Sequence, residues 1–257
     1  MNARLEGHVA VVTGATGDIG AEYVRGYVRQ GAQVVAADLA TGEDLGRQLA
    51  AEATAQGPGA ATFAPVDITS DDDLARLASR LRREHGRVDS VVNNAAVYSG
   101  LGPKRPLWDL TNDDWDLVLR VNVRGVWQVI TALLPLMKER GGGSIVNIAS
   151  TVTRAGVPGF LHYVASKAAV EGITRASARE LGAWGVRVNA VAPGLVSDSA
   201  THAINPAGYA ASSGAGRSLA REMLPSDLVG AVLWLAGPES AFVTGQTVLV
   251  DGGQQFS

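Results

Sequence analysis

The chain has 257 residues, of which 46% are hydrophobic and 18% charged, and its formal net charge is -3. That length fits one α/β domain with a full core, and the weak charge gives no electrostatic reason to expect nucleic acid or an anionic membrane as a partner. The sequence has no cysteine, which excludes disulfides, thiolate metal sites and a cysteine nucleophile, and which fits a cytoplasmic protein.

The N-terminal segment MNARLEGHVAVVTG leads almost at once into a strand-like run, without the charged and apolar regions of a signal peptide. No wholly apolar stretch reaches the ~18 residues of a membrane span. The four histidines are scattered, with no ligand-spaced pair, so we expect no metal site. They are His8, His85, His162 and His202.

Short apolar runs alternate with longer amphipathic segments along the chain. The runs predict strands at 8–13, 33–37, 61–66, 88–92, 144–149, 186–191 and 247–250, and the clearest helices are expected at 71–84, 112–140, 162–183 and 226–235. The strand runs are continuously apolar, which is typical of a parallel sheet covered by helices on both faces. The sequence therefore predicts one doubly wound α/β domain over residues 1–257, with a seven-stranded parallel sheet.

A glycine-rich turn, TGATGDIG, joins the first strand to the first helix. Gly14, Gly17 and Gly20 permit a tight turn and a close approach of the backbone to a pyrophosphate, and the helix that follows presents free N–H groups to it. An ordinary βα turn is the alternative. The acidic residue after the second strand favours dinucleotide binding.

That acidic residue is Asp38, at the end of QVVAAD. A carboxylate there can accept hydrogen bonds from the ribose hydroxyls of NAD and repel the extra phosphate of NADP. Neither Arg nor Lys occurs at positions 15, 16, 39 or 40 to bind that phosphate. We therefore predict NAD over NADP, with a solvated loop carboxylate as the alternative reading of Asp38.

Tyr163 and Lys167 stand at i and i+4, on one face of a predicted helix. A nearby ammonium favours the phenolate and lowers the pKa of the phenol, so Tyr163 could act as a general base. The alternative is a surface pair without a chemical role.

Two further polar residues are candidates for the same site. Ser150 follows a predicted strand, at the sheet edge where open α/β folds bind ligands, and could hydrogen-bond a substrate oxygen. A capping role is the alternative. Asn122, followed closely by Gly125, predicts a local break in the helix 112–140, although a polar residue satisfied inside the helix is the plainer reading.

Together these residues resemble the short-chain dehydrogenase/reductase family, in its single-domain branch, over nearly the whole chain. Asn122, Ser150, Tyr163 and Lys167 match the family's catalytic tetrad in order and spacing. The other matching segments are the cofactor turn at 13–20, the adenine-contacting pair at 67–68, NNAA at 93–96, PGLV at 193–196, TGQ at 244–246 and VDGG at 250–253.

The resemblance implies a Rossmann-type fold and hydride transfer between a nicotinamide cofactor and a secondary alcohol or ketone, without a metal. It implies that Tyr163 exchanges a proton with the substrate, and that Lys167 lowers the pKa of Tyr163 and holds the nicotinamide ribose. It implies that Ser150 positions the substrate oxygen, and that Asn122 fixes a helix break that holds a proton-relay water to Lys167.

The predicted cofactor-binding residues are Gly14, Thr16, Gly17, Asp18, Ile19, Gly20, Asp38, Asp67, Ile68, Asn94, Ala95, Tyr163, Lys167, Pro193, Gly194 and Val196. The predicted substrate-binding residues are Ser150, Val152, Tyr163 and Leu195.

Three residues depart from the family pattern. Asp18 replaces a glycine, and a carboxylate near the pyrophosphate is repulsive unless it turns away or caps the helix. Ala96 replaces a glycine in NNAA. Asp198 stands where a threonine commonly contacts the nicotinamide carboxamide, although the flanking Ser197 and Ser199 could substitute for it.

Three segments are expected to form the substrate pocket: 97–108, 151–160 and a lid at 195–221. The expected wall residues are Tyr98, Trp108, Val152, Val157, Phe160, Leu195 and Tyr209. Only Lys104, Arg105 and Arg154 could form a basic rim for a coenzyme-A or carrier-protein substrate. The sequence favours a small hydrophobic or aromatic secondary alcohol or ketone.

Two other functions stay open. One is an NADPH-dependent ketoreductase for β-ketoacyl or polyketide intermediates, against which Asp38 argues. The other is a non-catalytic nucleotide sensor, against which the Tyr163–Lys167 pair argues. The resemblance also implies a homodimer or homotetramer built on helices 112–140 and 162–183, which are apolar on more than one face.

Overall fold

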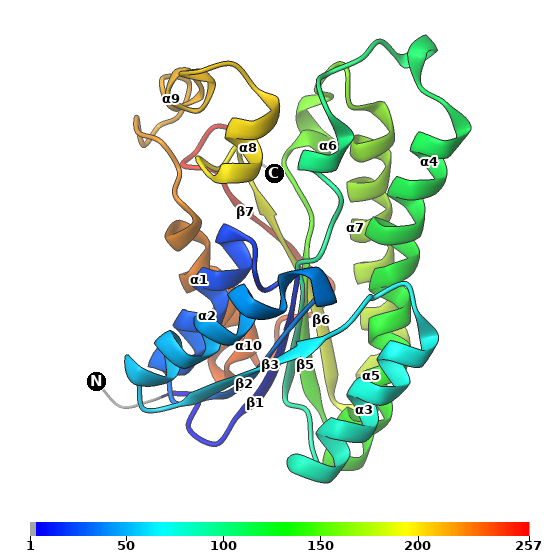
Figure 1. Ribbon diagram of the computed structural model, residues 1–257, viewed down its shortest axis with the longest axis vertical. Helices are drawn as coiled ribbons and strands as arrows, with labels where there is room; N and C mark the ends of the chain where they lie inside the picture. Colours follow the sequence, from blue (N-terminus) through cyan, green and yellow to red (C-terminus); the bar gives the residue numbers. More distant parts are fainter. Residues whose placement is uncertain (1–3, 257) are drawn as a thin grey trace.

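Seven parallel strands form one sheet in the order β3-β2-β1-β4-β5-β6-β7 (Figure 1). The computed structural model describes residues 4–256, so residues 1–3 and 257 of the predicted domain lie outside the described residues. The strands are β1 Val9–Thr13, β2 Gln33–Asp38, β3 Ala60–Pro65, β4 Ser90–Asn93, β5 Gly143–Ile148, β6 Val186–Pro193 and β7 Thr247–Val250. The predicted seven-stranded, doubly wound Rossmann-type fold is confirmed.

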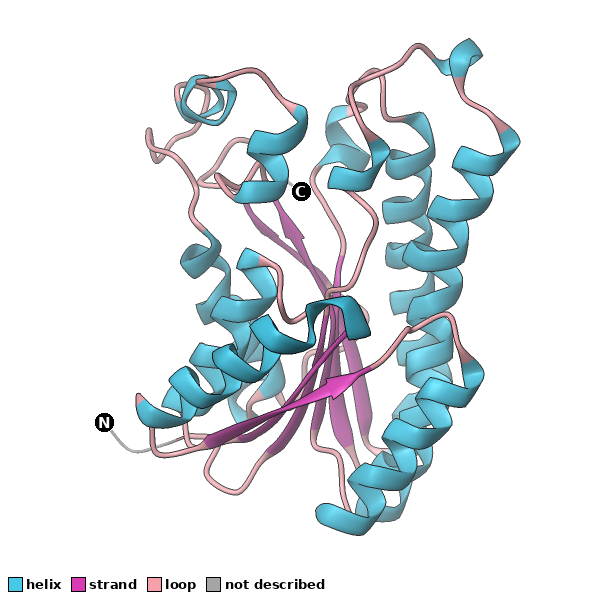
Figure 2. Cartoon of the chain, viewed as in Figure 1, coloured by secondary structure: helices cyan, strands magenta, loops and turns pink. Residues whose placement is uncertain are grey.

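Helices cover both faces of the sheet (Figure 2). One face carries α1 Asp18–Arg29, α2 Glu43–Ala55 and α10 Val229–Ala236, and the other carries α3 Asp71–Glu84, α5 Val126–Arg140 and α7 Leu161–Leu181. In β1, Val9 and Val11 pack into the core under α3, α5 and α7, while Ala10 and Val12 pack into the core under α1 and α10. Burial on both faces explains the continuous apolar runs.

The remaining elements are short. They are α4 Asn112–Leu119, a π-helix at Arg120–Gly125, α6 Val152–Ala155, α8 Ser199–Ile204 and α9 Tyr209–Gly214, with 3-10 turns at Ala40–Gly42, Ser99–Leu101, Leu107–Asp109, Gly182–Trp184, Pro225–Leu228 and Pro238–Ser240. The predicted helix 112–140 has the expected extent. The break predicted near Asn122 is a π-helical turn, which widens the helix without ending it.

Among the described helices, the span Asn112–Arg140 alone has the length and apolar composition to cross a membrane. Its residues Val129, Leu133 and Met137 are buried in the core against the sheet. A core helix has that composition as well.

The strand order reverses direction at β1, which has β2 on one side and β4 on the other. At such a point the βα connections leave toward opposite faces and open a crevice at the carboxyl edge of the sheet. Helices α8 and α9 lie above that edge (Figure 1).

Candidate active site

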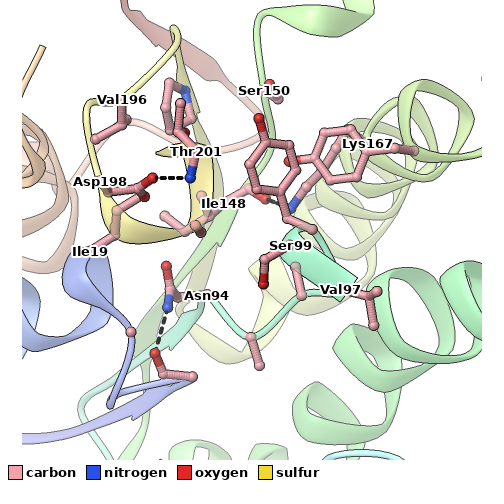
Figure 3. Close-up of a pocket in the computed structure, with 18 of the residues that line it drawn as sticks. Ile19, Asn94, Val97, Ser99, Ile148, Ser150, Lys167, Val196, Asp198 and Thr201 are labelled. Carbon is pink, nitrogen blue, oxygen red and sulfur yellow. Dashed lines mark hydrogen bonds between the residues drawn. The ribbon is translucent and has the colours of Figure 1, made fainter. Parts of the chain in front are cut away.

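A cleft of about 700 Å³ opens at the carboxyl edge of the strands. Every predicted cofactor and substrate residue lines this cleft. Of the four predicted catalytic residues, Asn122 does not line it and is buried behind its wall. Figure 3 shows Val196, Asp198 and Thr201 on one side of the cleft and Ser150 and Lys167 on the other.

The glycine turn after β1 is packed so tightly that two of its positions require glycine. Gly14 has φ +63°, and a Cβ there would lie 2.7 Å from the Cα of Ala95. A Cβ on Gly20 would lie 2.1 Å from the carbonyl oxygen of Gly14. Gly17 differs, because a Cβ there would meet only that oxygen, at 3.7 Å. Its missing side chain leaves room in the cleft, as a pyrophosphate approaching the backbone needs.

Asn94 ties the glycine turn to the end of β4. Its side-chain amide donates to the carbonyl oxygens of Thr13 at 3.1 Å and Gly14 at 3.0 Å. The Thr13 hydroxyl accepts from the backbone N–H groups of Asn94 and Ala95, both at 3.1 Å. The NNAA segment therefore shapes the turn as well as lining the cleft.

Asp38 ends β2 and faces the glycine turn. One carboxylate oxygen accepts from the Thr16 backbone N–H at 2.8 Å and from the Thr16 hydroxyl at 2.6 Å, and the other accepts from the Leu39 N–H at 2.8 Å. Asp67, at the same edge of the sheet, accepts from the N–H and the hydroxyl of Thr69, both at 2.8 Å. These hydrogen bonds fix the Asp38 carboxylate against the glycine turn, where it lines the cleft.

Tyr163, Lys167 and Ser150 meet where β5 ends beside α7. The Lys167 ammonium donates to the Ile148 carbonyl oxygen at 2.8 Å and lies 5.6 Å from the centroid of the Tyr163 ring. The exposed fractions of Tyr163, Lys167 and Ser150 are 8%, 4% and 8%. A surface pair would not be buried in this way, so the burial speaks against the alternative without a chemical role.

Burial governs the proton affinities of this group. It raises the pKa of the Tyr163 phenol well above its usual range, and the nearby Tyr98 and Asp198 raise it further, while the Ser150 hydroxyl lowers it. Burial also lowers the pKa of Lys167 to about 8. The lowered Tyr163 pKa expected from the sequence is therefore not found, because desolvation by burial is the largest influence on the phenol.

Asn122 acts on the site through neighbouring segments. Its side-chain oxygen accepts from the Val97 N–H at 2.8 Å, and its amide donates to the Val97 carbonyl at 3.3 Å and to the Ser166 hydroxyl at 3.2 Å. The Ser166 hydroxyl in turn donates to the Tyr163 carbonyl at 2.7 Å. Asn122 thus fixes a wall segment of the cleft and the first turns of α7 together.

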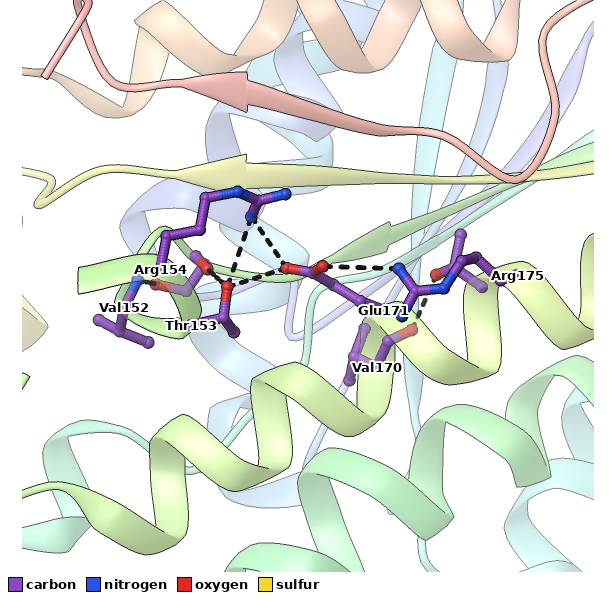
Figure 4. A network of polar contacts seen from close by, with 8 residues as sticks. Val152, Thr153, Arg154, Val170, Glu171 and Arg175 are labelled. Atoms are coloured by element: carbon purple, nitrogen blue, oxygen red, sulfur yellow. Dashed lines mark hydrogen bonds and ion pairs between the residues drawn. The ribbon is translucent and has the colours of Figure 1, made fainter. Parts of the chain in front are cut away.

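A buried carboxylate anchors the segment that follows Ser150 (Figure 4). Glu171 of α7 accepts from the Thr153 hydroxyl at 2.9 Å and from the Arg154 guanidinium at 3.1 Å, and it pairs with Arg175 at 3.7 Å. The Thr153 hydroxyl also lies 3.0 Å from the Ser150 carbonyl oxygen. The network ties α6 to α7 and so holds Ser150 beside Tyr163.

Aromatic rings form the wall next to Tyr163. The ring centroids of Tyr98 and Phe160 lie 5.2 Å and 6.3 Å from that of Tyr163. Val152, Val157, Leu195 and Tyr209 also line the cleft, as predicted. Trp108 was wrongly predicted. It does not line the cleft, and it is 77% exposed because the 3-10 turn Leu107–Asp109 turns it to solvent.

Comparisons with known proteins identify the family. A family model described as enoyl-(acyl carrier protein) reductase matches residues 14–255. The chain is 36% identical over 250 residues to 3-oxoacyl-(acyl-carrier-protein) reductase FabG of Thermotoga maritima, covering 97% of this chain and 98% of that protein. It is 34% identical over 251 residues to cyclopentanol dehydrogenase of a Comamonas species, with coverage of 97% and 98%. A solved short-chain type dehydrogenase/reductase from Mycobacterium ulcerans matches with a TM-score of 0.90 and 31% identity, over 97% of this chain and 90% of that chain. The chain belongs to the short-chain dehydrogenase/reductase family.

The resemblance predicted from the sequence motifs is therefore confirmed. Membership makes the chain an oxidoreductase of the class that acts on alcohols and ketones with nicotinamide cofactors. The cleft fits such a cofactor, because its glycine turn leaves backbone exposed where a Cβ would otherwise stand.

Two departures from the short-chain dehydrogenase/reductase pattern have a structural role in this chain. The Asp18 carboxylate reaches across the cleft mouth and accepts from the backbone N–H of Ser199 at 2.7 Å. Asp198 caps α8 and accepts from the Thr201 N–H at 2.7 Å. Both carboxylates therefore hold the first turn of the lid helix, and Asp18 turns toward the lid as the repulsion argument requires.

Two polar cleft residues, Gln254 and Gln255, lie outside every segment that the sequence predicted for the cleft. Lys104 lines the cleft within the predicted segment 97–108, and Thr201 and Asn205 line it within the predicted lid. The two glutamines line the cleft because the chain turns after β7, where the Asp251 carboxylate accepts hydrogen bonds from the backbone N–H groups of residues 253–255. The DGG motif followed by polar residues was the one signal in the sequence for that turn.

Proposed function

We propose that the protein transfers a hydride between NAD(H) and a small hydrophobic or aromatic secondary alcohol or ketone, with Tyr163 as the general acid and base. The observation that carries the proposal is the buried group of Tyr163, Lys167 and Ser150 beside an aromatic wall, in a cleft that also contains the glycine turn and Asp38. In this proposal the substrate oxygen lies between the hydroxyls of Ser150 and Tyr163.

Tyr163, Lys167 and Ser150 have separate roles in the proton transfer that accompanies hydride transfer. When bound, the nicotinamide cofactor supplies the hydride or accepts it. Tyr163 is a protonated phenol at neutral pH, since burial raises its pKa, and it gives this proton to a carbonyl oxygen during reduction. For oxidation it must first become a phenolate, which the Lys167 ammonium favours. Ser150 donates to the substrate oxygen as negative charge develops there.

The proposal is tested by following NADH formation by absorbance over a panel of small aliphatic and aromatic secondary alcohols. Turnover that depends on both NAD and a secondary alcohol is expected. Tight NADH binding without turnover of any alcohol would contradict the proposal and favour a nucleotide sensor.

We propose NAD as the preferred cofactor because the Asp38 carboxylate stands at the end of β2, where it would repel a 2′-phosphate. Asp38→Ala should lower the ratio of kcat/KM for NAD to that for NADP by about tenfold or more, since each 1.4 kcal/mol corresponds to tenfold. Asp44→Ala is the control, because Asp44 is exposed on α2 and does not line the cleft. An unchanged ratio in Asp38→Ala would contradict the proposed role.

A second candidate is a ketoreductase for substrates attached to a carrier, favoured by the similarity to 3-oxoacyl-(acyl-carrier-protein) reductase. Two cations of its expected rim are already paired, Arg105 with Asp114 at 2.7 Å and Arg154 with Glu171 at 3.1 Å. Because carboxylates of the same chain neutralise these two guanidinium groups, the rim attracts an acidic carrier protein only weakly. NADPH-dependent reduction of a 3-oxoacyl carrier in preference to free ketones would establish this candidate instead.

We also propose that the enzyme is cytoplasmic and forms a homodimer or homotetramer. The sequence without cysteine fits a reducing compartment. Apolar side chains exposed on α4, α5 and α7 support self-association.

A further inference from the structure

Lys104 is one of only three lysines in the chain, and it stands on the wall of the cleft. Its backbone packs against the segment around Gly159. A Cβ on Gly159, which has φ +83°, would lie 2.7 Å from the Lys104 Cβ, so that glycine allows the two segments to touch. The N–H of the next residue, Arg105, donates to the Gly159 carbonyl at 3.1 Å. The contact with Gly159 thus positions this loop so that the Lys104 side chain lines the cleft.

Among the described residues, aromatic groups and no carboxylate contact the Lys104 ammonium. It donates to the Tyr209 hydroxyl at 2.8 Å and lies 4.6 Å from the Tyr209 ring centroid and 5.7 Å from that of Phe160. No ion pair among the described residues includes Lys104, although its neighbour Arg105 is paired with Asp114. An ammonium has three donors, so this cation faces the cleft with two of them available to a ligand.

An apolar path connects this cation to the proton-carrying phenol. The Phe160 ring is near both groups, 5.7 Å from the Lys104 ammonium and 6.3 Å from the Tyr163 ring. The Tyr98 ring packs beside both Phe160 and Tyr163, at 6.1 Å and 5.2 Å. A substrate that reaches from Tyr163 to Lys104 therefore needs an apolar body between its two polar ends.

The charges in the cleft determine which end of such a substrate carries its negative charge. The Asp198 carboxylate raises the pKa of Tyr163 through its negative charge, so it would repel an anionic group at the lid end of the reacting centre. Lys104 places a positive charge on the cleft wall next to Phe160. One ammonium, with Asp38, Asp67 and Asp198 as carboxylates on the same cleft wall, suits a singly charged carboxylate, because a second negative charge would meet no further cation next to Phe160 among the described residues.

We propose that the substrate is a hydroxy acid or keto acid whose carboxylate binds Lys104 and whose apolar, ring-sized body packs against Phe160 and Tyr98. The inference rests on the proposed oxidoreductase function. In oxidation the carbinol carbon loses a hydride to NAD and the hydroxyl loses its proton to Tyr163, which leaves the ketone. The carboxylate takes no part in the reaction and serves recognition.

The test compares 4-acetylbenzoate with its methyl ester, two ketones of similar shape that differ in charge, each reduced with NADH. The variant Lys104→Met removes the ammonium and keeps an apolar stem. Lys138→Met is the matched control, because Lys138 lies over Trp184, outside the cleft wall. Wild type and Lys138→Met should prefer the carboxylate by about fivefold in kcat/KM, as expected for a partly exposed ion pair of about 1 kcal/mol.

In Lys104→Met this preference should disappear, because the KM for the acid should rise about fivefold more than the KM for the ester. In wild type, added salt should raise the KM for the acid and leave the KM for the ester unchanged, because salt screens the ion pair that the acid makes with Lys104. Equal kcat/KM for acid and ester in wild type, or a preference that Lys104→Met keeps, would overturn the inference while the proposed function stands. Failure of wild type to reduce either ketone or any alcohol of the panel would overturn the proposed function itself.

Discussion

At the scale of single residues, the proton affinity of Tyr163 controls how the reaction responds to pH. Oxidation needs the phenolate, and burial raises the pKa of Tyr163 above neutral pH, so the phenolate fraction grows tenfold per pH unit below that pKa. The logarithm of kcat/KM for alcohol oxidation should therefore rise with pH with a slope of about one. Ketone reduction uses the phenol and should stay nearly constant over the same range.

Lys167 adds a second feature to this profile. Because its pKa is about 8, it loses its positive charge above that pH and favours the phenolate less. The rise in oxidation should therefore flatten on the alkaline side. Initial rates measured from acid to alkaline pH in both directions check this, and an oxidation rate that falls between pH about 6 and 8 would contradict the assignment.

The spacing of Tyr163 and Lys167 predicted their proximity, because residues four apart share a helix face. Their pKa values could not be predicted from spacing. These depend first on burial and, for Tyr163, also on Tyr98 and Asp198, which come from distant parts of the chain. The sequence placed Lys104 on a possible basic rim, but it could not predict the contact with the Tyr209 hydroxyl, because Tyr209 comes from a distant part of the chain.

At the scale of elements, the contact between Asp18 and Ser199 joins the start of α1 to the start of α8. Ser199→Pro would remove the N–H donor together with the Ser199 hydroxyl, which lines the cleft, and Ser199→Ala, which keeps the N–H, controls for the loss of the hydroxyl. Proline suits the first position of a helix, and the preceding Asp198 already has the extended backbone that proline requires, with φ -138° and ψ 170°. The lid should then open more readily, and bound NADH should dissociate several times faster in stopped-flow fluorescence.

Asp18→Asn replaces a charge-assisted hydrogen bond by a weaker neutral one and should act in the same direction. The double variant Asp18→Asn with Ser199→Pro should be no faster than Ser199→Pro alone, since both changes act on one interaction. Circular dichroism controls for folding. Dissociation rates equal to wild type in both single variants would show that the contact does not hold the lid.

The positions of the strands and long helices could be predicted from the sequence, whereas the conformation of the lid could not. Buried strands and long amphipathic helices have strong periodic patterns, and all seven strands lie where predicted. The lid is rich in small residues, and its placement depends on contacts such as that of Ser199 with Asp18, 181 positions apart. Trp108 shows the same limit, because its type suggested a wall residue while the local turn exposes it.

At the scale of the whole molecule, exposed apolar side chains point to self-association. Trp127 on α5, Leu119 on α4 and Leu161 on α7 are 56%, 38% and 44% exposed. Leaving such side chains in water is unfavourable when a second copy can cover them. We expect wild type to be a dimer or tetramer in size exclusion with light scattering.

Trp127→Glu should shift this assembly toward smaller species, because it places a charge in the proposed contact. Leu45→Glu is the control, since Leu45 is 55% exposed on α2, which covers the opposite face of the sheet. A monomeric wild type at micromolar concentration would contradict the expected assembly.

The function proposed for the whole molecule depends most directly on Tyr163 as the proton carrier. The decisive measurement compares turnover of a secondary alcohol with NAD by wild type and by Tyr163→Phe, together with NADH affinity by fluorescence titration. Tyr163→Phe should lose about 10²–10⁴-fold in kcat, the usual contribution of a general acid or base, with little change in the Kd for NADH. A Tyr163→Phe variant that turns over at a rate near that of wild type would contradict the proposed mechanism.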